Sequence, residues 1–230
     1  MIDFRYLIGD VILHHKSLQE IINRRFRSKT QYILDKEDYK TIETKDGIKF
    51  YTKGNLETLK DIKDDYVTND IHSKDTVFDL GANIGGFTLL AAKVGKKVVS
   101  VEPVMWRELI DNIGLNLLDN VTLYIRAISN EKEVEIHWEG IHKVSAIPFK
   151  TLLAVEGPCD FLKCDIEGGE WSIDPVDLSG IRRIEMEMHK FGHPNHKSKY
   201  KALLEAINIT HNYEITPRAG VYGILHARMK

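Results

Sequence analysis

Two hydrophobic patterns divide the chain near residue 75. Apolar residues recur at helical spacing over residues 2–26, which predicts one or two amphipathic helices. Apolar and polar residues alternate around Asp46-Gly47, which predicts a β-hairpin over residues 39–52. We therefore expect an N-terminal helical segment with a β-hairpin over residues 1–53, followed by one larger domain over residues 54–230.

Beyond residue 75, short runs of β-branched residues alternate with helical segments. The pattern predicts helices over residues 85–94, 104–118 and 198–207, and strands over residues 76–80, 97–101, 121–127, 161–164 and 181–188. Extended segments are expected at 133–138 and 144–148, and a terminal antiparallel hairpin over 213–226. Strand–helix–strand repetition at this spacing predicts an α/β fold, in which helices cover both faces of a mostly parallel sheet.

Composition places the chain among globular proteins. Of its 230 residues, 43% are hydrophobic and 29% are charged, and the formal net charge is −2. Such a chain can bury a core, which excludes disorder, and it offers no overall electrostatic attraction for nucleic acid. The two cysteines, Cys159 and Cys164, match no zinc or redox spacing, and no apolar run approaches the ~18 residues of a membrane span. We therefore expect a soluble, cytoplasmic protein without a membrane span.

A glycine-rich turn, residues 79–86, stands between the first strand and the first helix of the larger domain. Glycine lets backbone approach a ligand closely at the carboxyl edge of a sheet, where open α/β folds bind their ligands. Glu102 ends the next strand about 20 residues after Asp79, at the distance where a carboxylate can hold the hydroxyls of a ribose. Asn83 stands where a dinucleotide site has its middle glycine, and no P-loop is present. The sequence therefore indicates a nucleoside-containing cofactor other than NAD.

Three carboxylates follow the fourth strand of the domain: Asp165, Glu167 and Glu170. Such crowding is costly unless the groups are solvated or partnered, and it can raise one pKa toward that of a useful base. Glu170 has an alternative interpretation as an acid stabilised at a helix N-terminus.

Histidines gather at the end of the fifth strand. Alternation on that strand sends Glu185, Glu187 and His189 to one side, with His189 nearest the crevice. His189, His193 and His196 could form a metal cluster, but Gly192 and Pro194 preclude the helical spacing of a ligand pair. We therefore expect no metal, and we interpret the segment as a loop that lines the active site.

Two motifs carry a resemblance to a known family. The Asp-x-Gly-x-Asn-x-Gly form of the glycine turn resembles motif I of the class I S-adenosylmethionine methyltransferases. Residues 161–170, Phe-Leu-Lys-Cys-Asp-Ile-Glu-Gly-Gly-Glu, are similar to the signature of the FkbM-type methyltransferases, and the resemblance covers roughly residues 50–190. It implies a Rossmann-like catalytic domain with S-adenosylmethionine as cofactor, bound by Asp79, Gly81, Asn83, Gly85, Glu102, Pro103, Ala127, Ile128 and Asp165.

The resemblance also implies a reaction, the O-methylation of a hydroxyl group on a sugar or another small-molecule acceptor. A hydroxyl is a poor nucleophile until its proton leaves, so Asp165 or His189 is expected as the base, with Glu167 orienting the acceptor. Two alternatives stay open: an RNA (tRNA) methyltransferase, for which residues 24–29 are the only basic support, and a cofactor-binding module without activity. A small-molecule acceptor is expected rather than a nucleic acid.

Overall fold

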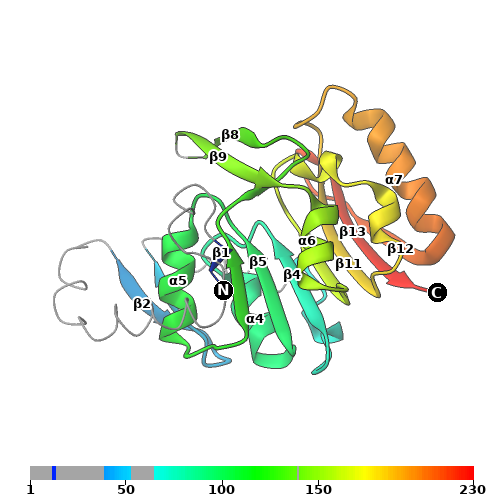
Figure 1. The fold of residues 1–230 in the computed structure, drawn as a ribbon. Helices are drawn as coiled ribbons and strands as arrows, with labels where there is room; N and C mark the ends of the chain where they lie inside the picture. Colours follow the sequence, from blue (N-terminus) through cyan, green and yellow to red (C-terminus); the bar gives the residue numbers. More distant parts are fainter. Residues whose placement is uncertain (1–11, 14–38, 53–64, 139) are drawn as a thin grey trace.

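The computed structural model describes residues 12–13, 39–52, 65–138 and 140–230. An eight-stranded sheet in the order β1-β6-β5-β4-β10-β11-β13-β12 forms the centre of this part of the chain (Figure 1). Its strands are β1 (Ile12–Leu13), β4 (Thr76–Leu80), β5 (Lys97–Val101), β6 (Val121–Tyr124), β10 (Phe161–Cys164), β11 (Arg183–His189), β12 (His211–Thr216) and β13 (Val221–Met229). The five strands from β6 to β11 are parallel, whereas β1 and β13 are antiparallel to their neighbours β6 and β11.

Helices cover both faces of this sheet (Figure 1). On one face, α4 (Gly86–Val94) and α5 (Trp106–Leu115) contribute Phe87, Leu89 and Leu109 to a buried cluster with Val77 and Val98. On the other face, buried residues of α6 (Phe149–Glu156) and α7 (His196–Thr210) pack in a second cluster with Phe78, Leu80 and Val99. Neighbouring residues of β4 and β5 thus point to opposite cores, as the two-residue period of a strand requires. The described part of the domain also contains three short 3₁₀ helices: Thr68–Asp70, Gly169–Ser172 and Pro175–Leu178.

The predicted hairpin is present as a separate two-stranded sheet, β2 (Lys40–Glu43) and β3 (Lys49–Thr52). It packs on α5, where backbone amides of Lys49 and Tyr51 donate to the side-chain oxygens of Asn116 and Asn112 at 2.9 and 2.6 Å. Phe50, nearly fully buried, joins the core cluster of α4 and α5. Burial of one such side chain contributes about 1.5–3 kcal/mol, so the hairpin is anchored by packing as well as by hydrogen bonds.

A second small sheet projects beyond the main one (Figure 1). It has the order β7-β9-β8 and consists of β7 (Ala127–Ile128), β8 (Glu133–His137) and β9 (Ile141–Ile147). Along β8 the residues alternate between exposed and half-buried, as expected for a hairpin with one face toward solvent.

The α/β fold predicted from the sequence is confirmed, including the terminal antiparallel hairpin β12–β13. Most of the predicted helical segment 2–26 lies outside the described residues, but the prediction is wrong at Ile12 and Leu13. These residues form β1 because they pair with Leu123 and Tyr124 along the open edge of β6. The proposed division between residues 53 and 54 stays a prediction.

Two further differences concern the middle of the chain. The single strand predicted over residues 121–127 ends at Tyr124, and the chain resumes as β7 because Ala127 and Ile128 pair with β9 in the smaller sheet. Helix α6 was not predicted. None of the helices that the structure describes combines the length and the apolar character that a membrane crossing requires.

Candidate active site

The glycine turn lies at the carboxyl edge of β4 and touches the turn after β10. Gly81 has a φ of +78°, and a Cβ atom added to it would lie 1.8 Å from the carbonyl oxygen of Asp165. Gly85 has a φ of +100° and caps α4, and a Cβ atom there would meet Leu109 at 2.7 Å. Only glycine fits both requirements, a left-handed conformation and close contact. The two predicted motifs are therefore in direct backbone contact.

Asp79 is fully buried beneath this turn. Its Oδ2 accepts a hydrogen bond of 2.6 Å from Thr88, and its Oδ1 lies 3.2 Å from the ammonium group of Lys163. Lys163 also donates to the carbonyl oxygen of Gly81 at 2.7 Å. Burial opposes the charge on Lys163, but the carboxylates of Asp79 and Asp165 keep its pKa above the ordinary value. These contacts tie the glycine turn to β10 from beneath.

Glu102 faces the same turn from the end of β5. Its Oε2 accepts 2.7 Å from the amide of Asn83, and its Oε1 accepts from the amides of Val104 and Met105. Burial raises the pKa of this carboxyl, and the three amides work against that rise. Asn83 has a φ of +51°, so its backbone is turned to reach the carboxylate. Among the described residues Oε2 accepts this one hydrogen bond, and its second lone pair can accept from a ligand hydroxyl.

The remaining residues predicted to surround the cofactor follow β5 and β6 in the chain. Ala127 and Ile128 are buried in β7, and Pro103, half-buried, follows Glu102 directly. The amides of Gly81 and Ala82 both donate to the carbonyl oxygen of Val101, at 2.9 and 3.1 Å, which ties the glycine turn to β5.

Asp165, Glu167 and His189 meet at one point. Nε2 of His189 lies 3.4 Å from Oε2 of Glu167 and 3.9 Å from Oδ1 of Asp165. The other oxygen of Asp165 accepts 3.1 Å from the hydroxyl of Tyr66. Burial raises the pKa of Glu167, and so do the charges of Asp165 and Glu170, whereas His189 lowers it. The three residues predicted to be catalytic from the sequence are thus brought together.

Glu170 holds the imidazole of His189 from behind. Its Oε1 accepts from the backbone amide of His189 at 2.6 Å and lies 3.1 Å from Nδ1 of the ring, while Oε2 accepts from the amide of Gly168. The buried carboxylate is acceptor-only, so Nδ1 carries a proton and donates to it, while Nε2 faces Asp165 and Glu167. Burial opposes protonation of His189, but the three carboxylates raise its pKa above the ordinary value. Glu170 is therefore a positioning residue, which sequence reasoning had left open.

The turns after β10 and β11 are locked together by two glycines and a tryptophan. A Cβ atom on Gly168 would lie 2.6 Å from Cα of Gly192, and one on Gly192 would lie 2.4 Å from Cα of Gly168. Nε1 of Trp171 donates to the carbonyl oxygens of His189 and Phe191 at 3.1 and 2.9 Å. This close contact fixes the segment that carries His189.

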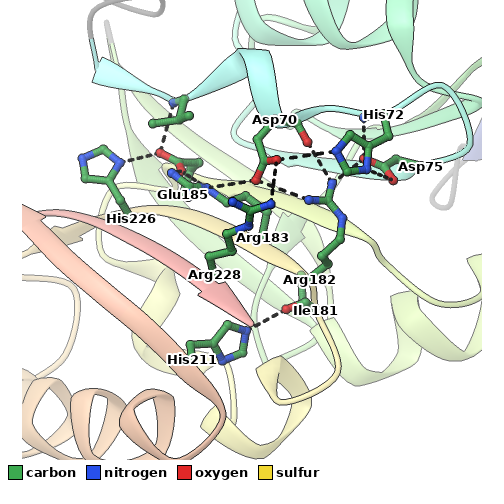
Figure 2. Close-up of polar contacts among 11 residues, drawn as sticks. Asp70, His72, Asp75, Ile181, Arg182, Arg183, Glu185, His211, His226 and Arg228 are labelled. Carbon is green, nitrogen blue, oxygen red and sulfur yellow. Dashed lines mark hydrogen bonds and ion pairs between the residues drawn. The ribbon is translucent and has the colours of Figure 1, made fainter. Parts of the chain in front are cut away.

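The segment 65–75 brings Tyr66 to the site, and an ion-pair network fastens this segment to the start of β11 and the end of β13. Figure 2 shows Asp70 among the guanidinium groups of Arg182, Arg183 and Arg228, from which it lies 3.3, 4.0 and 3.8 Å. Beside this group, buried Glu185 accepts from Nδ1 of His226 at 2.6 Å and, at 3.2 Å, from the backbone amide of the residue after Tyr66. The network holds Tyr66 where its hydroxyl meets Asp165.

Tyr66 and Lys163 are the site residues that sequence reasoning missed. Lys163 appeared only as one residue of the signature run, and neither motif includes Tyr66. Burial and the nearby Asp165 hold the pKa of Tyr66 well above its usual range, so its hydroxyl remains a donor.

His193 and His196 do not join His189. Nδ1 of His193 accepts from the amide of Asn195, and Nδ1 of His196 lies 2.8 Å from the hydroxyl of Tyr222. Within the described residues, Asp165, Glu167 and His189 are the one group of three or more with ligand atoms close enough to hold a metal ion.

Comparison with known proteins identifies the fold. No protein-family model matches the sequence. The chain is 37% identical over 68 residues to the 23S rRNA (uracil(1939)-C(5))-methyltransferase RlmD of Shewanella amazonensis, a match that covers 29% of this chain and 15% of RlmD.

Two solved structures are similar to more than two thirds of this chain. The methyltransferase FkbM from Methylobacillus flagellatus has a TM-score of 0.51 at 16% identity, over 68% of this chain and 44% of FkbM. Trm5b from Pyrococcus abyssi has a TM-score of 0.53 at 15% identity, over 84% of this chain and 56% of Trm5b. The chain thus spans less than two thirds of each protein. These similarities show that the chain has the Rossmann-like fold of the class I methyltransferases.

Proposed function

We propose that this protein is an S-adenosylmethionine-dependent methyltransferase that transfers the methyl group to a hydroxyl of a sugar or another small molecule. The observation that carries the proposal is the contact between Gly81 and Asp165. It joins a turn suited to a nucleoside cofactor to a group of acid and imidazole side chains suited to proton transfer. Ligands of open α/β sheets bind at this edge.

The cofactor side is assigned to the glycine turn and Glu102. The free acceptor position on Oε2 of Glu102 suits a ribose hydroxyl, while Pro103, Ala127 and Ile128 would supply apolar surface for the adenine. Gly81, Asn83 and Gly85 shape the backbone around the methionine part, and Asp79 with Lys163 keeps that backbone in place.

The acceptor side is assigned to Asp165, Glu167 and His189. Methyl transfer from a sulfonium is an in-line displacement, so alignment of the acceptor oxygen and removal of its proton are the main tasks. Glu170 orients the ring of His189 so that Nε2 can accept the proton, and Asp165 lies beside Nε2. Either can serve as the base, with Glu167 orienting the acceptor.

The resemblance of residues 161–170 to the FkbM-type signature supports a small-molecule acceptor. The test begins with calorimetric titration of S-adenosylhomocysteine and NAD, followed by an acceptor screen. We expect binding of the first ligand alone, and loss of turnover in Asp165→Asn with nearly unchanged affinity for S-adenosylhomocysteine. Glu135→Gln, an exposed change on β8, is the matched control. Retained turnover in Asp165→Asn would reject the assignment.

An RNA acceptor is the second candidate, because the RlmD match is to an rRNA methyltransferase. Binding to rRNA or tRNA that weakens steeply with salt, together with methyl transfer to it, would favour this candidate. Tight S-adenosylhomocysteine binding without transfer to any acceptor would indicate a binding module.

The cytoplasmic location remains a proposal. Cys159 and Cys164 are both free thiols in the structure.

A further inference from the structure

The group formed by Asp165, Glu167 and His189 has a geometry that proton transfer alone does not require. One ligand atom from each residue lies within 4.8 Å of the others, and two of the distances are 3.4 and 3.9 Å. Two ligands of one ion at metal–ligand distances of about 2.0–2.2 Å stand roughly 3–3.6 Å apart. Small side-chain movements would close the difference, and the side chain of Glu167 is 55% exposed and so can make them.

The imidazole of His189 is prepared for a ligand. The residue is only 3% exposed, its Nδ1 faces the buried carboxylate of Glu170, and its Nε2 makes no hydrogen bond in the described structure. A carboxylate behind one ring nitrogen, which fixes the tautomer and aims the other nitrogen, is the usual arrangement behind a metal-binding histidine. Nε2 points between two carboxylates, which are also metal ligands.

Charge at this point favours a cation. The carboxylates of Asp165, Glu167, Glu170 and Glu187 all interact electrostatically with His189. The guanidinium group of Arg218 lies 3.5 Å from Glu187 but also pairs with Asp65, so two carboxylates share its positive charge. Carboxylates gathered this closely repel one another, and a bound cation removes that cost.

We propose that Asp165, Glu167 and Nε2 of His189 bind one divalent first-row transition-metal ion. A mixed set of one imidazole nitrogen and two carboxylates suits Mn²⁺ or Zn²⁺, whereas Mg²⁺ favours oxygen ligands alone. Three protein ligands leave coordination positions open to a further oxygen. The inference rests on the proposed function for its consequence: with the ion bound, Nε2 of His189 would serve as a ligand and not as the base, and the ion would hold the acceptor hydroxyl.

Metal binding is tested on the full chain after treatment with a chelator and without cofactor. Mn²⁺ is titrated in, and the loss of the free-ion electron paramagnetic resonance signal is recorded, with Zn²⁺ and Mg²⁺ as competitors. We expect about one Mn²⁺ per chain, displaced by Zn²⁺ more readily than by Mg²⁺. Because loss of a second-shell partner alone costs about 10–100-fold in affinity, His189→Gln and Glu167→Gln should each lose at least tenfold.

Matched controls are His137→Gln and Glu135→Gln, both exposed on β8, which should bind Mn²⁺ as the unchanged protein does. Glu167→Gln alters an exposed side chain, so it keeps the test valid if His189→Gln fails to fold. No Mn²⁺ or Zn²⁺ binding, or equal binding by Glu167→Gln and the unchanged protein, would overturn the proposal.

The metal proposal and the proposed function can fail separately. Binding of S-adenosylhomocysteine without any metal binding would reject the ion and leave the methyltransferase. Binding of one Mn²⁺ by the unchanged protein, lost in Glu167→Gln, would support the ion even if S-adenosylhomocysteine did not bind.

Discussion

The hydroxyl of Tyr66 donates a hydrogen bond of 3.1 Å to Oδ2 of Asp165, although the two residues are 99 positions apart in the chain. The bond leaves the other oxygen, Oδ1, facing His189. Tyr66 thereby fixes Oδ2 of the carboxylate and leaves Oδ1 open to the site.

Tyr66→Phe tests whether this hydrogen bond is needed to orient Asp165. The ring should stay packed, since it lies edge-on to Phe87 at 6.3 Å, and only the hydrogen bond is removed. Such a bond contributes about 0.5–1.5 kcal/mol, so kcat/KM should fall by up to roughly tenfold if Asp165 must be held in one orientation. Affinity for S-adenosylhomocysteine, measured by calorimetry, should not change.

The control is Tyr39→Phe, which removes a comparable bond of 2.7 Å to Glu108 on the far side of α5. It should leave kcat/KM unchanged. An equal loss in both variants would show that Tyr66 acts on stability and not on Asp165.

Gly81→Ala should destabilise the protein and abolish S-adenosylhomocysteine binding. The added Cβ would lie 1.8 Å from the carbonyl oxygen of Asp165, so backbone must move. Gly220→Ala is the control, because Gly220 has a similar φ of +82° and no atom within 4 Å of an added Cβ. The control should lose only about 1–2 kcal/mol in urea denaturation, the cost of the left-handed backbone. Equal losses would contradict the close contact.

Lys163→Met should destabilise the protein by about 3–5 kcal/mol, because it leaves the buried carboxylate of Asp79 without its cation. The double variant with Asp79→Asn should regain part of that loss, since neither charge is then buried alone. Urea denaturation of the four proteins in this double-mutant cycle gives the coupling. Additive losses would mean that the pair is not coupled.

Cys159 and Cys164 should resist thiol reagents in the folded protein. Burial raises the pKa of both thiols well above the ordinary value, so the reactive thiolate forms only at higher pH than usual. We expect almost no labelling at pH 8 in native buffer and two labelled thiols per chain in denaturant. Fast labelling of the native protein would contradict the buried placement.

Much of the sheet was predictable because local pattern and tertiary environment agree there. The strands at residues 76–80, 97–101 and 161–164 have the predicted bounds, since buried parallel strands are continuous apolar runs between turn residues. The strand predicted at 121–127 was too long and β1 was missed, because pairing partners elsewhere in the chain decide where a short strand ends or forms.

By itself, the sequence determined the α/β fold, the glycine turn and the placement of Asp165, Glu167 and His189 at strand ends. Strand period and turn chemistry are local properties, and parallel strands bring their carboxyl ends to one edge. Only the tertiary structure assigned Glu170 to the back of His189, Tyr66 to Asp165 and Lys163 to Asp79. Each of these pairs joins segments far apart in the chain or on different turns, and hydrogen-bond and ion-pair partners at such separations depend on packing that no local pattern encodes.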